Sequence, residues 1–129
     1  MYKAENKIQS FRDLHAWREA YQLAMIIYKV TKAFPKEELF GIIMQIRRAA
    51  ISVASNIAEG FSRNSIKEKI QFYYTALGSL TELRNQLDLS KGIGYLPENN
   101  YPDLENQALR CDKLIHGLIK SCKSLIPNT

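Results

Sequence analysis

Residues 45–65 read QIRRAAISVASNIAEGFSRNS, and this stretch decides the fold. Apolar side chains recur in it at steps of three and four residues, as one face of an α-helix requires. Several residues between them are small, so a neighbouring helix backbone can approach closely. The small residues are Ala49, Ala50, Ser52, Ala54, Ser55 and Ala58. We predict a tightly packed helix that ends at Gly60 in a left-handed conformation, because glycine takes positive φ without a Cβ clash.

The same period extends over four segments of the chain. It predicts helices over residues 13–34, 36–59, 65–91 and 100–125, the third capped by Ser65 and Glu68 and ended by Gly92 and Gly94. Pro102 is tolerated only in a first turn, which places the start of the fourth helix near Asn100. Four helices joined by short connections predict an all-α, up-down-up-down antiparallel four-helix bundle with a left-handed twist. The core row of the second helix is predicted to be Leu39, Ile42, Ile46, Ala50, Val53 and Ile57.

A single domain is expected from the length of 129 residues. We divide the chain into an N-terminal extension (1–11), the bundle (12–125) and a C-terminal tail (126–129). The first helix carries two apolar rows that together cover about half of its circumference, more than one core-facing stripe needs. On the second helix, Met44 and Ile51 point away from the core row. These surplus apolar side chains predict contacts between subunits. The two rows are Leu14, Trp17, Tyr21, Ala24, Tyr28 and Ala16, Ala20, Leu23, Ile27, Val30, Phe34.

The composition is that of an ordinary globular protein, with 46% hydrophobic and 24% charged residues. The net charge of +5 is spread evenly along the sequence: residues 1–60 hold nine basic and six acidic side chains, and residues 61–129 hold nine and seven. This charge permits contact with nucleic acid without requiring it. No apolar run is long enough for a signal peptide core or a membrane span, so a cytoplasmic protein without membrane contact is expected. Cys111 and Cys122 lie eleven residues apart on one helix, which predicts buried free thiols.

The sequence contains no motif that dictates a reaction or a cofactor. There is no Glu-x-x-His pair, no phosphate-binding glycine loop, no Cys-x-x-Cys and no nucleophile elbow. Asp112 and His116 share a helix face, as a weak metal site or as a solvated hydrogen-bonded pair. We expect no enzyme activity, no metal site and no cofactor. Among the aromatic residues, Phe72 and Tyr73 lie on the apolar face of the third helix, and Tyr74 is freer to stack on a base.

The polar side chains of residues 45–65 gather into one arc of the helix, while Arg47 falls at the edge of the apolar face. Two interpretations stay open. In the structural one, Asn56 and Glu59 bind main-chain groups at the following turn, and Arg48 pairs with a carboxylate. In the functional one, Arg47 and Arg48 contact a phosphate or a partner, together with Arg63 and Lys67 beyond the helix. The residues assigned to a polar cluster or interface are Gln45, Ser52, Asn56, Glu59 and Gly60.

The spacing of several motifs resembles a known family. The motifs are F11-x-D13-L14-x-x-W17, F34-P35-x-x-E38, Q45-I-R47-R48-A-x-x-S52-x-x-x-N56-I-A-E59-G60, A76-x-G78-S79-x-x-E82-L83 and G94-Y95-L96. Over residues 10–120 they resemble the bacterial four-helix bundle proteins, also called 23S rRNA intervening sequence proteins because some are encoded inside insertions in the large ribosomal RNA gene. The chain departs from the family pattern at Ile43, where leucine is common, and at Pro102.

The resemblance implies homo-oligomers, typically pentameric rings, without established catalytic residues. The accessory variability protein of diversity-generating retroelements resembles the family in fold, and forms a basic pentameric barrel that works with a reverse transcriptase and nucleic acid. The leading hypothesis is therefore a non-enzymatic homo-oligomeric scaffold that binds RNA or a nucleic-acid-processing protein. The alternatives are a protein-binding adaptor without nucleic-acid affinity and a bundle enzyme or metal carrier.

Overall fold

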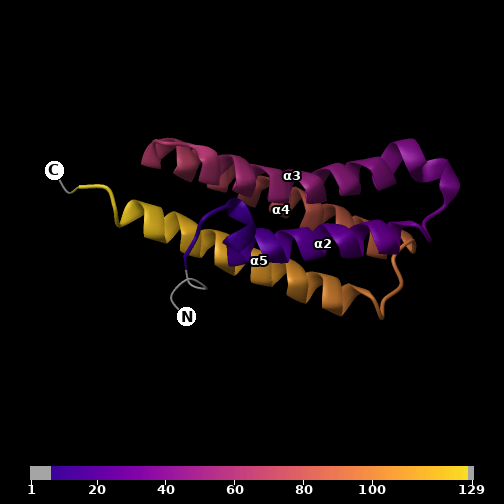
Figure 1. Ribbon diagram of the computed structural model, residues 1–129. Coiled ribbons are helices and arrows are strands. Elements are labelled where there is room, and N and C mark those ends of the chain that lie inside the picture. The colour runs from indigo at the N-terminus through magenta and orange to yellow at the C-terminus, as the bar shows by residue number, and fades with distance from the viewer. Residues whose placement is uncertain (1–6, 128–129) are drawn as a thin grey trace.

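A computed structural model describes residues 7–127, and all regular secondary structure in this range is helical. Four long helices lie side by side, and the colours of Figure 1 show that successive helices run in opposite directions. They are α2 (His15–Thr31), α3 (Met44–Ser62), α4 (Ile66–Ile93) and α5 (Tyr101–Lys123). Three short elements are η1 (Phe11–Asp13), η2 (Lys36–Glu38) and η3 (Leu39–Ile43). The predicted all-α four-helix bundle is confirmed, while its left-handed twist stays a prediction.

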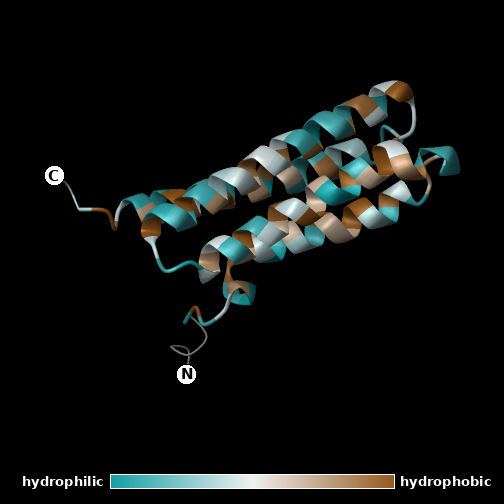
Figure 2. Ribbon diagram, turned by 90° about the horizontal axis from the view of Figure 1, so that it is seen from above, coloured by the Kyte–Doolittle hydropathy of each residue, from teal (hydrophilic) through white to brown (hydrophobic). Residues whose placement is uncertain are grey.

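One apolar core runs through the bundle, because α2 and α4 each pack against both α3 and α5. Hydrophobic and hydrophilic segments alternate along each helix in Figure 2, as expected for helices that bury one face. Of the two apolar rows on α2, the row containing Ala20, Leu23 and Ile27 is the one that enters the core. In the other row, Leu14 and Ala24 are also buried, while Tyr21 is exposed and its ring stacks on that of the half-buried Trp17 with centroids 5.3 Å apart.

The second predicted helix is interrupted near its start, and the placement of Leu39 in the core row is wrong. Residues 39–43 form a π-helical turn in which Gly41 departs from helical geometry (φ −107°, ψ −115°). A π turn contains one residue more than an α turn and rotates the preceding residues around the axis. Ile43 is therefore buried, while Leu39 is exposed.

The prediction that Gly60 ends the helix in a left-handed conformation is also wrong. Within residues 7–127, Gly94 is the one residue with positive φ, and α3 continues through Gly60 to Ser62. Gly60 is buried against α4, and a Cβ at this position would lie 2.7 Å from Cε1 of Tyr73. Glycine is needed here for close approach between α3 and α4, which is a packing requirement rather than a conformational one.

The starts of α4 and α5 agree with the sequence, whereas α2 ends at Thr31, before the predicted end at residue 34. The Ser65 hydroxyl accepts the backbone N–H of Glu68 at 3.3 Å, but within the described residues the Glu68 carboxylate makes no return bond to the Ser65 N–H, so only half of the predicted cap forms. Gly94 ends α4 with φ of 100°. Asn100 is the N-cap of α5, and Pro102 lies in its first turn. Both cysteines are buried free thiols, as predicted. The division into extension, domain and tail stays a prediction, and residues 1–6 and 128–129 lie outside the described range.

Candidate nucleic-acid interface

Arg47 is held within the bundle at the C-terminal end of α2. Its Nε donates to the Thr31 hydroxyl at 2.9 Å, its Nη2 donates to the Tyr28 carbonyl at 3.4 Å, and its guanidinium lies 4.5 Å from the Tyr28 ring centre. The last carbonyls of a helix attract a positive charge, so the position stabilises the fold. The half-buried Arg47 therefore ties α3 to α2 and has little of its guanidinium left for an external phosphate.

Arg48 is exposed beside a polar hollow of about 390 Å³ between α3 and α4. The hollow is lined by Gln45, Arg48, Ala49, Ser52 and Glu82. Among residues 7–127, the Arg48 side chain forms no ion pair or hydrogen bond, so the predicted pairing with a carboxylate is not found. Glu82 contributes a negative charge to the same hollow, which makes it a poor site for a phosphate.

The small polar residues of the arc join α3 to α4. The Ser52 and Ser79 hydroxyls lie 2.7 Å apart, and the Asn56 amide donates to the Ser52 carbonyl at 2.9 Å and to its hydroxyl at 3.0 Å. Asn56 thus bonds one turn back on its own helix and not at the α3–α4 turn. Glu59 likewise pairs with Arg63 at 2.5 Å instead of binding main-chain groups. This part of the predicted polar cluster stabilises packing between the two helices.

The two candidates beyond α3 differ in their surroundings. Arg63 is engaged by Glu59, lies 3.9 Å from a Glu68 carboxylate oxygen and stacks over the Phe72 ring at 4.7 Å. Lys67 is exposed on the first turn of α4, and the described part of the chain offers it no ion pair or hydrogen bond. Of the four basic residues proposed as contacts, Arg48 and Lys67 are therefore the ones with unengaged charges.

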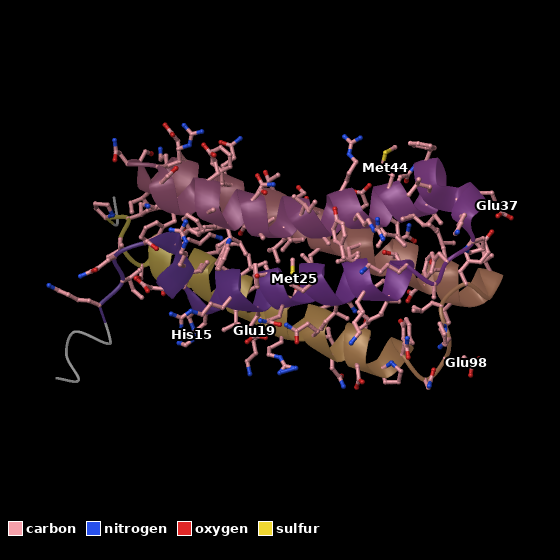
Figure 3. All side chains as sticks on the ribbon, turned by 45° about the vertical axis from the view of Figure 1, so that its right-hand side comes forward. His15, Glu19, Met25, Glu37, Met44 and Glu98 are labelled. Atoms are coloured by element: carbon pink, nitrogen blue, oxygen red, sulfur yellow. The ribbon has the colours of Figure 1, made fainter. Side chains whose placement is uncertain are left out.

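The positive charge is concentrated at one end of the bundle, although it is even along the sequence. We define the terminal half by cutting each helix near its middle, as residues 7–22, 54–79 and 113–127, and the far half as residues 23–53 and 80–112. The terminal half holds nine basic and four acidic side chains, and the far half holds eight of each. Figure 3 shows Glu37 and Glu98 at the far end and His15 near the N-terminus. Within residues 7–127, the whole excess of +5 belongs to the terminal half.

The acidic residues of the terminal half are engaged, which leaves several lysines uncompensated. Asp13 accepts the backbone N–H groups of Gln9 and Ser10, and Glu19 lies 3.6 Å from Arg110. Glu59 and Glu68 both face Arg63, as described above. Within the described residues, all six lysines of this half lack a carboxylate within ion-pair distance, although Lys69 donates to the carbonyls of Gly60 and Phe61. The other five are Lys7, Lys67, Lys113, Lys120 and Lys123.

An exposed aromatic ring lies among these lysines. Tyr74 on α4 is 47% exposed, and its hydroxyl accepts a hydrogen bond from Lys123 Nζ at 2.9 Å. Its neighbour Tyr73 points into the core, where burial raises the pKa of its hydroxyl to about 12. The prediction that Tyr74 is the freer of the two rings is confirmed.

An apolar band covers the outer side of α2, η3 and α3. Phe40 is 82% exposed on the interrupted turn, beside a hollow that Tyr28, Ile43 and Met44 help to line. Figure 3 labels Met25 on α2 and Met44 on α3. Large exposed apolar side chains that gather on one face mark an interaction site. The exposed members of the band are Tyr21, Met25, Leu39, Phe40, Met44 and Ile51.

Few side chains in the described part of the chain could act in catalysis or bind a metal. Residues 7–127 contain no cluster of three or more histidine, cysteine or acidic side chains. His116 Nδ1 lies 2.9 Å from the backbone carbonyl of Asp112 and 3.5 Å from its carboxylate, and both side chains are exposed to solvent. Burial raises the pKa of the Cys111 thiol to about 12, so this thiol stays protonated at neutral pH. No helix within this range is long and apolar enough to span a membrane.

The comparisons with known proteins agree with the fold. A solved structure from Bacteroides thetaiotaomicron, described as a protein with unknown function from the S23 ribosomal protein family, has 24% sequence identity and a TM-score of 0.75. The similarity covers 81% of this chain and 95% of that one, and at this identity it shows the fold alone. No curated protein matches the chain. The family model of the 23S rRNA-intervening sequence protein matches residues 12–117, and the chain therefore belongs to this family.

Proposed function

We propose that this protein is a non-enzymatic scaffold that associates with copies of itself, as a pentameric ring, and binds RNA through its terminal half. The observation that carries the proposal is the charge asymmetry of the bundle: the terminal half has a net charge of +5 and the far half has none. RNA is attracted by uncompensated lysine and arginine charges that lie together, irrespective of its sequence.

Self-association strengthens this attraction. In a cyclic ring, rotation about the symmetry axis brings the equivalent halves of all subunits to the same level. Five terminal halves would then present about +25 on one side of the ring, which attracts a polyanion more strongly than one subunit does. The apolar band on α2, η3 and α3 supports an interface between subunits, because burial of such side chains drives association.

RNA binding is tested by fluorescence anisotropy of a labelled RNA at rising ionic strength. We expect binding at low salt, with an affinity that falls linearly on a double-logarithmic plot against salt concentration. An absence of binding at low salt would contradict the nucleic-acid half of the proposal.

Self-association is tested by light scattering with a matched pair of variants. Ile51 lies in the apolar band and is 45% exposed, whereas Leu109 lies on α5 and is 44% exposed. We expect wild type and Leu109→Asp to have several times the monomer mass of 14.8 kDa, and Ile51→Asp to approach that mass. A wild-type mass near that of the monomer at micromolar concentration would overturn the ring.

A protein-binding adaptor without RNA affinity is the second candidate, favoured by the exposure of Phe40. An adaptor of this kind binds a protein partner through the apolar band, and its net charge is incidental. It predicts that Arg47→Ala or Arg48→Ala disturbs assembly while leaving the affinity for any polyanion unchanged. RNA binding by wild type at low salt, lost in proportion to lysines removed from the terminal half, would decide against it.

A further inference from the structure

We propose that the terminal half binds single-stranded RNA on the outer side of α4 and α5, with one base stacked on Tyr74 and phosphates held by Lys67, Lys120 and Lys123. These four residues are called the Tyr74 surface. The inference rests on the proposed RNA binding and specifies where the RNA lies and which form of RNA is bound.

The Tyr74 ring is about half exposed, although a lysine is close. The ammonium of Lys123 lies 2.9 Å from the Tyr74 hydroxyl and 5.4 Å from the ring centre. These two distances place the ammonium beyond the hydroxyl, along the long axis of the ring, and not above a face. Tyr74 is 47% exposed, so the part of its ring that faces solvent is accessible to a base.

The lysines lie on both sides of this ring. Lys67 precedes Tyr74 by seven residues, which is two helical turns, so both occupy the same face of α4. On α5, Lys120 lies three residues before Lys123 and shares its outer face. The hydrogen bond between Lys123 and Tyr74 shows that these faces of α4 and α5 adjoin. A strand stacked on Tyr74 would thus meet ammonium groups from two helices.

Few negative charges oppose a phosphate on this surface. Glu59 and Glu68 both face the Arg63 guanidinium. The lysines of the Tyr74 surface have no carboxylate partner within residues 7–127, so their charge is available to phosphates.

The combination of an exposed ring and lysines selects single strands. In a duplex, each base is covered on both faces by its neighbours, and a protein reaches phosphates and groove edges instead. In a single strand, a base can leave its neighbours and stack on an aromatic side chain, whatever its identity. Tyr74 therefore predicts a preference for single-stranded over double-stranded RNA, with little dependence on sequence.

The test measures the affinity of an unstructured, labelled single-stranded RNA and of a duplex made from the same strand, by anisotropy over a range of salt concentrations. Loss of one stacked base weakens binding by about 5- to 150-fold, so Tyr74→Ala should lose this factor for the single strand and little for the duplex. Tyr74→Phe keeps the ring and should bind as wild type does, because the ring and not the hydroxyl forms the stack.

The lysines are tested by a double variant and its matched control. Lys120→Gln with Lys123→Gln should reduce the slope of log affinity against log salt by about 1.4, since each phosphate contact contributes about 0.7 for single strands. Lys29→Gln with Lys32→Gln removes the same charge from the far half and should leave the slope unchanged.

The outcomes distinguish a failure of the Tyr74 surface from a failure of the proposed RNA binding. If wild type binds no RNA at low salt, the proposed function fails and the inference fails with it. If wild type binds, but Tyr74→Ala binds the single strand as wild type does, the Tyr74 surface is refuted while RNA binding stands. Equal losses for single strand and duplex, or equal slopes for the two lysine pairs, would also overturn it.

Discussion

Replacing Gly60 with alanine should destabilise the bundle relative to the same change at an exposed helical glycine. In an exposed helix interior, Gly→Ala stabilises by about 1 kcal/mol, because alanine loses less conformational entropy. At Gly60 the new methyl group would lie 2.7 Å from Cε1 of Tyr73 and 3.0 Å from Cβ of Phe72. Overpacking of this kind costs about 1–3 kcal/mol, which offsets or exceeds the helical gain.

Gly117 provides the control, because it lies inside α5 and a Cβ there would meet no atom within 4 Å. The free energy of unfolding should differ between Gly60→Ala and Gly117→Ala by about 1–3 kcal/mol. With a urea m-value near 1.5 kcal/mol/M, the transition midpoints should lie roughly 0.7–2 M apart at one fixed protein concentration. Circular dichroism measures these midpoints.

The cause can be assigned by changing the residue that the methyl group would strike. Tyr73→Leu removes Cε1, so the cost of Gly60→Ala should be smaller in that background, with a coupling energy of about 0.5–3 kcal/mol. Equal stabilisation by Gly60→Ala and Gly117→Ala would refute the close approach. A cost that is unaffected by Tyr73→Leu would place its origin in the backbone and not in the contact.

The other predictions concern pH, a cap and the thiols. Burial raises the pKa of Tyr73 from 10.0 to about 12 and that of Cys111 from 9.0 to about 12, so the folded state keeps protons that the unfolded state loses. The free energy of unfolding should therefore fall as the pH rises from about 9 to 12, and urea unfolding at stepped pH measures this. Ser65→Ala leaves the Glu68 N–H without its acceptor and should cost about 0.5–2 kcal/mol of unfolding free energy, whereas Ser65→Asp should retain the cap. Cys111 and Cys122 should react with a thiol reagent at the rate of unfolding, and fast reaction of both under native conditions would contradict their burial.

The fold could be predicted because its local signals agree with one another. Ser65, Gly94 and Pro102 act at helix ends through contacts within a few residues, so their roles follow from local sequence. Leu39 and Gly60 were misjudged because their environment is set by tertiary structure. The π turn rotates Leu39 out of the core, and the ring of Tyr73 on the next helix is what requires glycine at position 60.

The candidate site was harder to predict, because residue type alone does not show whether a charge is free. Arg47 and Arg63 suit phosphate as well as any arginine, yet the bundle engages one with Tyr28 and Thr31 and the other with Glu59. The partners of Arg47 lie on α2, so no pattern within residues 45–65 shows that it is engaged, whereas the i,i+4 spacing of Glu59 and Arg63 is a local signal for their pair. The lysines of α4 and α5 carry weaker local signals, but their charge stays uncompensated.

The charge asymmetry could have been found from the sequence by counting in another way. In an antiparallel bundle, the start of one helix lies beside the end of the next, so a division of the chain at residue 60 mixes both ends and cancels their difference. If each predicted helix is cut at its middle and alternate halves are added, the excess of basic residues falls on the end that contains the α3–α4 turn. The net charge of +5 is even along the sequence, but folding of the helices against one another places it at one end of the bundle, where it can attract a polyanion. Topology, which the apolar period predicts well, therefore had to be used before the net charge could indicate where an RNA would bind.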